Sequence, residues 1–94
     1  PPVRTQLLGN VPNPFNPQTR IRFQLAEAGH ARVTIYDVTG RLVRMLVDEQ
    51  RTAGENSITW QGRDDSGRRV SSGAYYVRLE TDGLVDHRKI MMLK

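Results

Sequence analysis

Short runs in which apolar and polar residues alternate, each closed by a glycine, recur through the whole chain. In one such run Ile21, Phe23 and Leu25 are separated by polar residues. Alternation with a period of two directs one face toward a core and the other toward water, which is the pattern of a β-strand. The glycines that close the runs are Gly29, Gly40, Gly54, Gly62, Gly67, Gly73 and Gly83. This spacing predicts an all-β fold, an antiparallel sandwich of about seven short strands that needs no helix.

Two turns are expected to join predicted strands into hairpins. The segment from Asp37 to Gly40 has Asp at its first position and Gly at its last, and Asp82 with Gly83 forms a tighter turn. The run over residues 42 to 47 is apolar at both odd and even positions. It is therefore either a strand covered on both faces or a strand that contains a β-bulge, and both alternatives stay open.

Two further segments are assigned from the same pattern. Trp60 alternates in phase with Ile58, so we expect Trp60 to point inward as the central core residue. Arg69 and Val70 follow a dense turn and are expected to form a short strand that ends before Gly73.

Size and composition limit the chain to one small domain. It has 94 residues, and a core of this size cannot be divided and leave either half enough buried apolar surface. It has no cysteine, which excludes a disulfide framework, a thiolate metal site and a cysteine nucleophile. The formal net charge is +4, but the arginines are evenly spread and interleaved with acidic residues. We therefore expect no nucleic-acid partner, and no apolar run is long enough for a transmembrane segment.

Residues suited to catalysis are few. His30 and His87 both have polar neighbours and no sequence partner that would make either a general base. The chain contains no nucleophile motif and no glycine-rich phosphate loop. We expect a protein that is not an enzyme and that has no cofactor.

The segment Asp64-Asp65-Ser66-Gly67 superficially resembles a calcium loop, because adjacent carboxylates and a sharp bend suit a hard cation. A full loop needs alternating ligands and a later bidentate glutamate, whereas Arg68 and Arg69 follow here. An Asx-turn between strands is the favoured interpretation, and no metal ligand is assigned.

The segment over residues 11 to 19 contains three prolines and one large aromatic residue, and it is interpreted as an ordered structural cap. Proline has no amide hydrogen to donate, so this segment must lie extended along an edge or over the sandwich. Phe15 is expected to plug the open end of the core, and the two asparagines are expected to hydrogen-bond locally. The cap residues are Pro12, Pro14, Phe15 and Pro17.

Four segments in order carry a family resemblance. They are Pro12-Asn13-Pro14-Phe15-Asn16-Pro17, Ile35-Tyr36-Asp37 with Gly40-Arg41-Leu42-Val43, Trp60-Gln61-Gly62-Arg63-Asp64, and Ser72-Gly73-Ala74-Tyr75-Tyr76. With these segments the chain resembles a type A C-terminal sorting domain of the type IX secretion system. It is also similar to the Ig-like domain of flagellar hook-capping proteins. The resemblance implies an Ig-like antiparallel β-sandwich over residues 12 to 94, preceded by a linker from an upstream cargo domain over residues 1 to 11.

The resemblance also implies a function and a set of recognition residues. A domain of this family directs a larger exported protein through the outer-membrane secretion machinery, so the implied location is secreted or at the cell surface. A sortase commonly removes such a domain and attaches the cargo to anionic lipopolysaccharide. The implied signal lies in the last two strands. Its residues in this chain are Gly73, Tyr75, Val77, Arg78, Leu79, Lys89, Ile90, Met91, Met92, Leu93 and Lys94.

A physical mechanism and two alternative functions accompany this interpretation. A last strand near a sheet edge has unpaired backbone groups, so a receptor would bind it by strand addition, with Lys89 and Lys94 selecting for charge. Gly73 and Tyr75 also fit a purely structural role in a turn and a core. The main alternative function is an Ig-like spacer or assembly module, as in the hook cap. A carbohydrate-binding module is weaker, because only Tyr36 and Tyr76 remain as platform residues.

Overall fold

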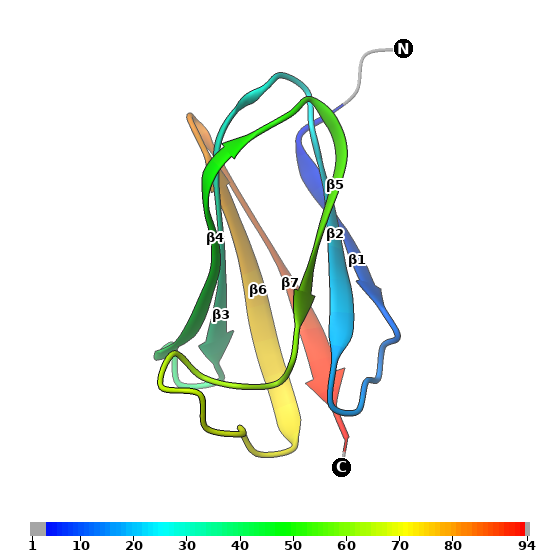
Figure 1. Cartoon of the computed structure of the whole chain (residues 1–94), viewed down its shortest axis with the longest axis vertical. Coiled ribbons are helices and arrows are strands. Elements are labelled where there is room, and N and C mark those ends of the chain that lie inside the picture. The colour runs from blue at the N-terminus through cyan, green and yellow to red at the C-terminus, as the bar shows by residue number, and fades with distance from the viewer. Residues whose placement is uncertain (1–3, 94) are drawn as a thin grey trace.

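Seven antiparallel strands in two facing sheets make up the computed structural model, which describes residues 4 to 93 (Figure 1). The three-stranded sheet has the order β1-β2-β5, and the four-stranded sheet has the order β4-β3-β6-β7. The strands are β1 (Gln6–Val11), β2 (Thr19–Leu25), β3 (Gly29–Asp37), β4 (Leu42–Arg51), β5 (Gly54–Trp60), β6 (Gly73–Thr81) and β7 (Leu84–Met92). This arrangement confirms the predicted Ig-like sandwich of about seven short strands.

The alternating pattern in the sequence places its apolar members between the two sheets. Along β2 the odd-numbered Ile21, Phe23 and Leu25 are buried, while their even-numbered neighbours are exposed or half-buried. Val33 and Ile35 of β3 face them from the other sheet as part of the same buried cluster. Burial of this apolar surface is the main favourable term in the folding of such a domain.

Trp60 lies in the middle of an aromatic row at one end of the core. Its ring centroid lies 5.6 Å from that of Phe15 and 5.3 Å from that of Tyr75, and all three side chains are buried. The indole Nε1 donates a hydrogen bond to the carbonyl oxygen of Arg63 at 2.9 Å, so the buried polar atom is satisfied. The central position predicted for Trp60 is confirmed.

The run over residues 42 to 47, which is apolar at both odd and even positions, lies in β4. This strand is at the edge of its sheet and contains two β-bulges. The register between β3 and β4 shifts between Val33 and Thr34, and again between Ile35 and Tyr36. As a result Val43, Leu46 and Val47 all belong to or pack against the core, although their numbers differ in parity. The structure therefore selects the bulge from the two alternatives.

Two predicted boundaries are wrong. Arg69 and Val70 form no strand of their own, and only an isolated bridge joins Arg63 to Arg69. Residues 1 to 11 were assigned to a linker, but Gln6–Val11 forms β1 and pairs with β2. The prediction failed because β1 contains Gly9 at a register irregularity, which interrupts the alternation on which strand assignment depends.

Within residues 4 to 93 every regular element is a strand. No helix in this part of the chain is long and apolar enough to cross a membrane.

Candidate recognition surface

The hairpin of β6 and β7 contains ten of the eleven predicted signal residues within or directly after its strands. The two strands pair in a continuous register from Gly73 opposite Met92 to Thr81 opposite Leu84, closed by the predicted turn at Asp82 and Gly83. The eleventh residue, Lys94, lies outside the described residues. The turn and both strands thus agree with the sequence analysis.

Five of the ten described signal residues point into the core. The buried members are Tyr75, Val77, Leu79, Ile90 and Met92. A folded domain cannot present these side chains to a receptor, so their contribution to recognition can only be indirect, through the stability of the hairpin. The structural role considered for Tyr75 is the one that the packing supports.

The outward side chains of the hairpin are those that a partner can touch. The Arg78 side chain is 40% exposed, Lys89 is exposed, and the next outward residue on β7 is Met91. Leu93 follows the strand and is also exposed. The candidate recognition surface is therefore the solvent face of β6 and β7, and it includes Tyr76, which the signal residues implied by the resemblance omit.

The proline-rich cap binds directly to the end of β7. The amide of Phe15 donates to the carbonyl oxygen of Met91 at 3.0 Å, and the amide of Leu93 donates to the carbonyl oxygen of Phe15 at 2.8 Å. The amide of Met91 donates to Oδ1 of Asn13 at 3.2 Å. Phe15 is buried as predicted, but the Asn13 bond is long-range and not local. The edge at the end of β7 is therefore already occupied, which corrects the expectation of unpaired backbone groups there.

Gly62 allows the cap, β7 and the loop after Trp60 to meet. It has a φ of +73°, and a Cβ built there would lie 2.5 Å from Cε of Met92 and 2.6 Å from the carbonyl oxygen of Pro17. Any larger residue would force both neighbours to move. Glycine at this position thus sets how closely the cap and the last strand approach.

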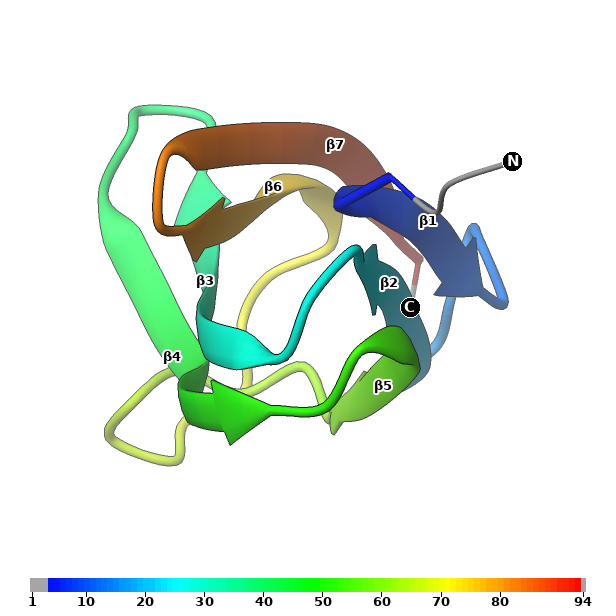
Figure 2. The same ribbon diagram turned by 90° about the horizontal axis from the view of Figure 1, so that it is seen from above.

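Farther along β7, two side chains bridge to β1 of the other sheet. Oδ2 of Asp86 accepts a hydrogen bond from the amide of Leu7 at 2.9 Å, and Nε of Arg88 donates to the carbonyl oxygen of Leu7 at 3.2 Å. Figure 2 shows β7 running alongside β1 where the two sheets meet. The role of Asp86 was not predicted, because nothing in the local sequence pattern indicates a partner 79 residues away.

Tyr75 closes the start of β6. Its hydroxyl donates to the carbonyl oxygen of Ser71 at 2.6 Å, four residues upstream, as in the tyrosine corner of Ig domains. Burial raises the pKa of this phenol above its ordinary value, and the nearby Asp37 carboxylate adds to the rise. The hydroxyl therefore stays protonated and serves as a structural donor.

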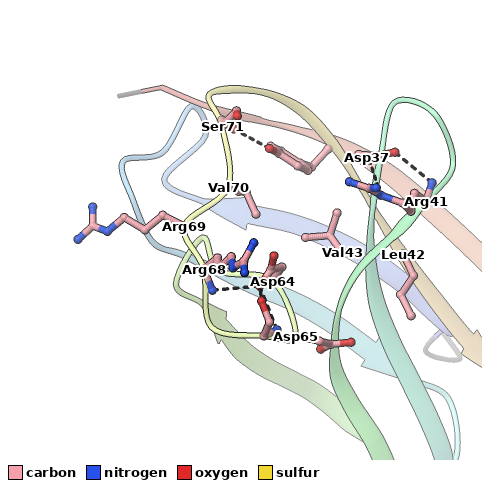
Figure 3. Close-up of a pocket in the computed structure, with 12 residues that line it drawn as sticks. Asp37, Arg41, Leu42, Val43, Asp64, Asp65, Arg68, Arg69, Val70 and Ser71 are labelled. Atoms are coloured by element: carbon pink, nitrogen blue, oxygen red, sulfur yellow. Dashed lines mark hydrogen bonds and ion pairs between the residues drawn. The ribbon is translucent and has the colours of Figure 1, made fainter.

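Two turns of the same construction, Asp37 to Arg41 and Asp64 to Arg68, border a cleft of about 660 Å³ (Figure 3). Oδ1 of Asp37 accepts from the amide and hydroxyl of Thr39 and from the amide of Arg41. Oδ1 of Asp64 accepts the equivalent bonds from Ser66 and Arg68. The sequence analysis predicted both turns, but not their equivalence.

These bonds lower the pKa of both carboxyl groups. The hydroxyl of Thr39 is the largest cause for Asp37, and the hydroxyl of Ser66 is the largest cause for Asp64. Oδ1 of the adjacent Asp65 accepts from the amide of Met45 at 3.1 Å. These oxygens are already used by backbone and hydroxyl donors, and within residues 4 to 93 no cluster of three acidic or histidine side chains could hold a metal ion. The Asx-turn is the arrangement present.

Comparison with known families identifies the class of protein to which this sandwich belongs. Residues 9–83 match the family described as FlgD Ig-like domain, which is most of the chain. The chain therefore belongs to the FlgD Ig-like domain family. No curated protein matches it in sequence.

Three solved structures are similar to this chain in fold. FlgD from Pseudomonas aeruginosa is similar with 26% identity and a TM-score of 0.65, over 79% of this chain and 58% of that one. Latent PorU from Porphyromonas gingivalis is similar with 21% identity and a TM-score of 0.78, over 95% of this chain and 9% of that one. PorZ of the same organism is similar with 24% identity and a TM-score of 0.63, over 90% of this chain and 11% of that one. The chain thus spans well under two thirds of each of these proteins.

Proposed function

We propose that this domain is a non-catalytic sorting and anchoring module that directs a larger exported protein through the type IX secretion system to the cell surface. The observation that carries the proposal is the exposed, cationic outer face of the β6–β7 hairpin, where Arg78 and Lys89 flank Tyr76. The partners are the outer-membrane secretion machinery and a sortase, with anionic lipopolysaccharide as the attachment point and the cargo upstream.

Likeness of fold supports this role. PorZ is described as an essential bacterial surface component of the type-IX secretion system, and part of it has a fold similar to that of this chain. In PorU and PorZ the similar region is a small part of a much longer chain, as expected for a module attached to a cargo.

The hydrogen bonds of β7 determine how a receptor would bind. Antiparallel pairing directs the backbone groups of alternate residues away from the neighbouring strand, and in β7 these are the odd-numbered residues. The groups of Met91 and Leu93 are occupied by the cap, whereas those of Lys89 point outward in the middle of the edge. A receptor would therefore contact the outward side chains and the backbone of Lys89 alone, because the cap and the bonds of Asp86 and Arg88 to Leu7 occupy the edge on either side.

Surface delivery of a reporter tests the proposal. Residues 1 to 94 are fused to a fluorescent protein with an export signal, in a host that has the secretion system. Reversal of Arg78 and Lys89 to Glu should reduce surface fluorescence at least tenfold. Reversal of Arg20 and Arg69, which are also exposed, changes the net charge equally and should leave delivery intact. Equal delivery by both double variants would overturn the proposed recognition surface.

Membership of the FlgD family favours a second candidate, an Ig-like spacer or assembly module. The family match ends at residue 83, so it covers β6 but not β7. An assembly module would retain its role when the outward charges of β7 are reversed. Surface delivery that does not depend on residues 1 to 94 at all would favour this candidate.

A further inference from the structure

A groove of about 470 Å³ lies on the outer face of the four-stranded sheet, on the opposite side of that sheet from the core. Its lining includes Tyr36, Val38, Tyr76, Arg78, Val85 and His87, and we call it the tyrosine groove. Its volume is within the range of small-ligand sites.

Strand register brings the polar and aromatic parts of the tyrosine groove together. Tyr36 of β3 lies directly opposite Tyr76 of β6, and Arg78 of β6 lies directly opposite His87 of β7. Directly opposed side chains have Cβ atoms about 4.5–5.5 Å apart, so the two tyrosine side chains leave neighbouring positions on the sheet, beside Arg78. Val38 and Val85 are both more than half exposed and add apolar surface to the lining.

The charges in and around the tyrosine groove favour an anion. Arg78 forms an ion pair with Glu80, with 3.5 Å between Nε and Oε1, and this Nε atom is buried without a hydrogen-bond partner among the described residues. Asp37 also lines the groove, but its carboxylate is bonded within its own turn. Lys89, opposite Tyr76, adds a second cation. The Arg78 side chain is 40% exposed and contacts Glu80 through Nε, so its terminal nitrogens are the part of the guanidinium that a planar carboxylate from outside would meet.

From this arrangement we infer that the tyrosine groove binds an acidic oligosaccharide. Sugar C–H groups stack against the negative faces of the two tyrosine rings, while a uronate carboxylate pairs with the guanidinium of Arg78. A second copy of the domain is disfavoured, because the chain has a net charge of +4. The tyrosine groove shares Tyr76 and Arg78 with the proposed export surface, but sugar binding is measured on the isolated chain and is tested separately from export.

A titration followed by NMR tests the inference without a secretion system. The ¹⁵N-labelled chain is titrated with trigalacturonate and, separately, with neutral maltotriose. Trigalacturonate should shift the amides of Tyr36, Tyr76, Arg78 and His87 and should bind more tightly than maltotriose. Tyr76→Ala should weaken binding at least tenfold, and Arg78→Gln should abolish the preference for the acidic sugar.

A matched variant and a second measurement keep the inference falsifiable. Arg20→Gln removes the same charge from an exposed site on the other sheet and should leave the affinity unchanged. Shifts that spread over all exposed arginines, or no shift with either sugar at millimolar concentration, would overturn the inference. Sedimentation that finds a dimer in the parent chain and a monomer in Tyr76→Ala would also overturn it, because a second copy would then fill the groove.

Discussion

The two sheets meet along two seams that are built differently. At the β1–β7 seam, hydrogen bonds join residues that are 78 to 81 positions apart, through Asn13, Asp86 and Arg88. At the β4–β5 seam, bulges let Val43 and Leu46 pack inward, and a surface pocket of about 200 Å³ lies beside Leu46 and Trp60. The first seam is closed by directed bonds between the two ends of the domain. The second combines apolar packing with bonds from β4 to Asp64 and Asp65, which lie only about 20 positions away in the loop after β5.

This difference explains why the cap is an integral part of the domain. The last strand depends on residues near the start of the chain for the bonds at its end, so the N-terminal segment and β7 are stabilised together. The β4–β5 seam has no equivalent dependence, because its packing comes from neighbouring parts of the chain. Substitutions at the β1–β7 seam should therefore be the more damaging.

The largest effect is expected at the cap. Phe15→Ala removes a buried ring that contacts Trp60 and should lower the free energy of unfolding by about 3–5 kcal/mol. Leu46→Ala at the other seam should cost less than half as much, because Leu46 is only partly buried. Urea unfolding followed by tryptophan fluorescence measures both values. Similar losses would show that the two seams contribute equally.

Gly62 tests the close approach behind the cap. Gly62→Ala should cost about 2–4 kcal/mol, because it combines a positive φ with collisions against Met92 and Pro17. Gly67→Ala is the matched control: its φ is also positive, but its Cβ meets nothing within 4 Å, so only about 1 kcal/mol is expected. Equal thermal shifts for the two variants would argue against the close approach.

Asp86 tests the bond across the β1–β7 seam. Asp86→Ala leaves the partly buried amide of Leu7 without its acceptor and should cost about 1–2 kcal/mol. Asp82→Ala changes an exposed turn carboxylate and should have an effect within about 0.5 kcal/mol. Denaturant midpoints compare the two. A smaller effect for Asp86→Ala than for Asp82→Ala would show that the bond from Leu7 to Asp86 does not stabilise the seam.

The smallest expected effect is on the stability of the domain in acid, through the two turns that border the cleft near β4. The pKa values of Asp37 and Asp64 are lowered in the folded state from the ordinary value of 3.8, so their stabilisation is fully present above that value. It is lost as the pH falls through the lowered folded pKa values. Thermal melts between pH 5 and pH 2 should show this loss, and Asp37→Asn should make it shallower. An unchanged acid profile in that variant would contradict the assignment.

The sequence predicted the strands well because alternation is a local signal. Phe23 and Trp60 are buried as their phase indicates, and the turn at Asp82 is where a two-residue loop was expected. The bulges of β4 were predicted only as one of two alternatives. Apolar residues at both odd and even positions also fit a strand that is covered on both faces. Local pattern was therefore sufficient for the architecture.

The candidate site was less predictable, because it depends on pairing across the chain. Family resemblance selected Tyr75 and Ile90 together with Arg78, but only the register separates buried from outward residues. Likewise, Asn13 was expected to bond locally, and only the fold brings its side chain to Met91. The tyrosine groove also arises from register, since Tyr36 and Tyr76 are 40 positions apart in number and directly opposite in space.

Hydrogen exchange along β7 tests most directly whether the cap fixes the end of this strand and leaves its middle open. The amides of Met91 and Leu93 are bonded to Asn13 and Phe15, whereas that of Lys89 points away from β6. The amides of Met91 and Leu93 should exchange at least tenfold more slowly than that of Lys89, and Asn13→Ala should speed exchange at Met91. Exchange at Met91 and Leu93 as fast as at Lys89 would contradict a closed β1–β7 seam.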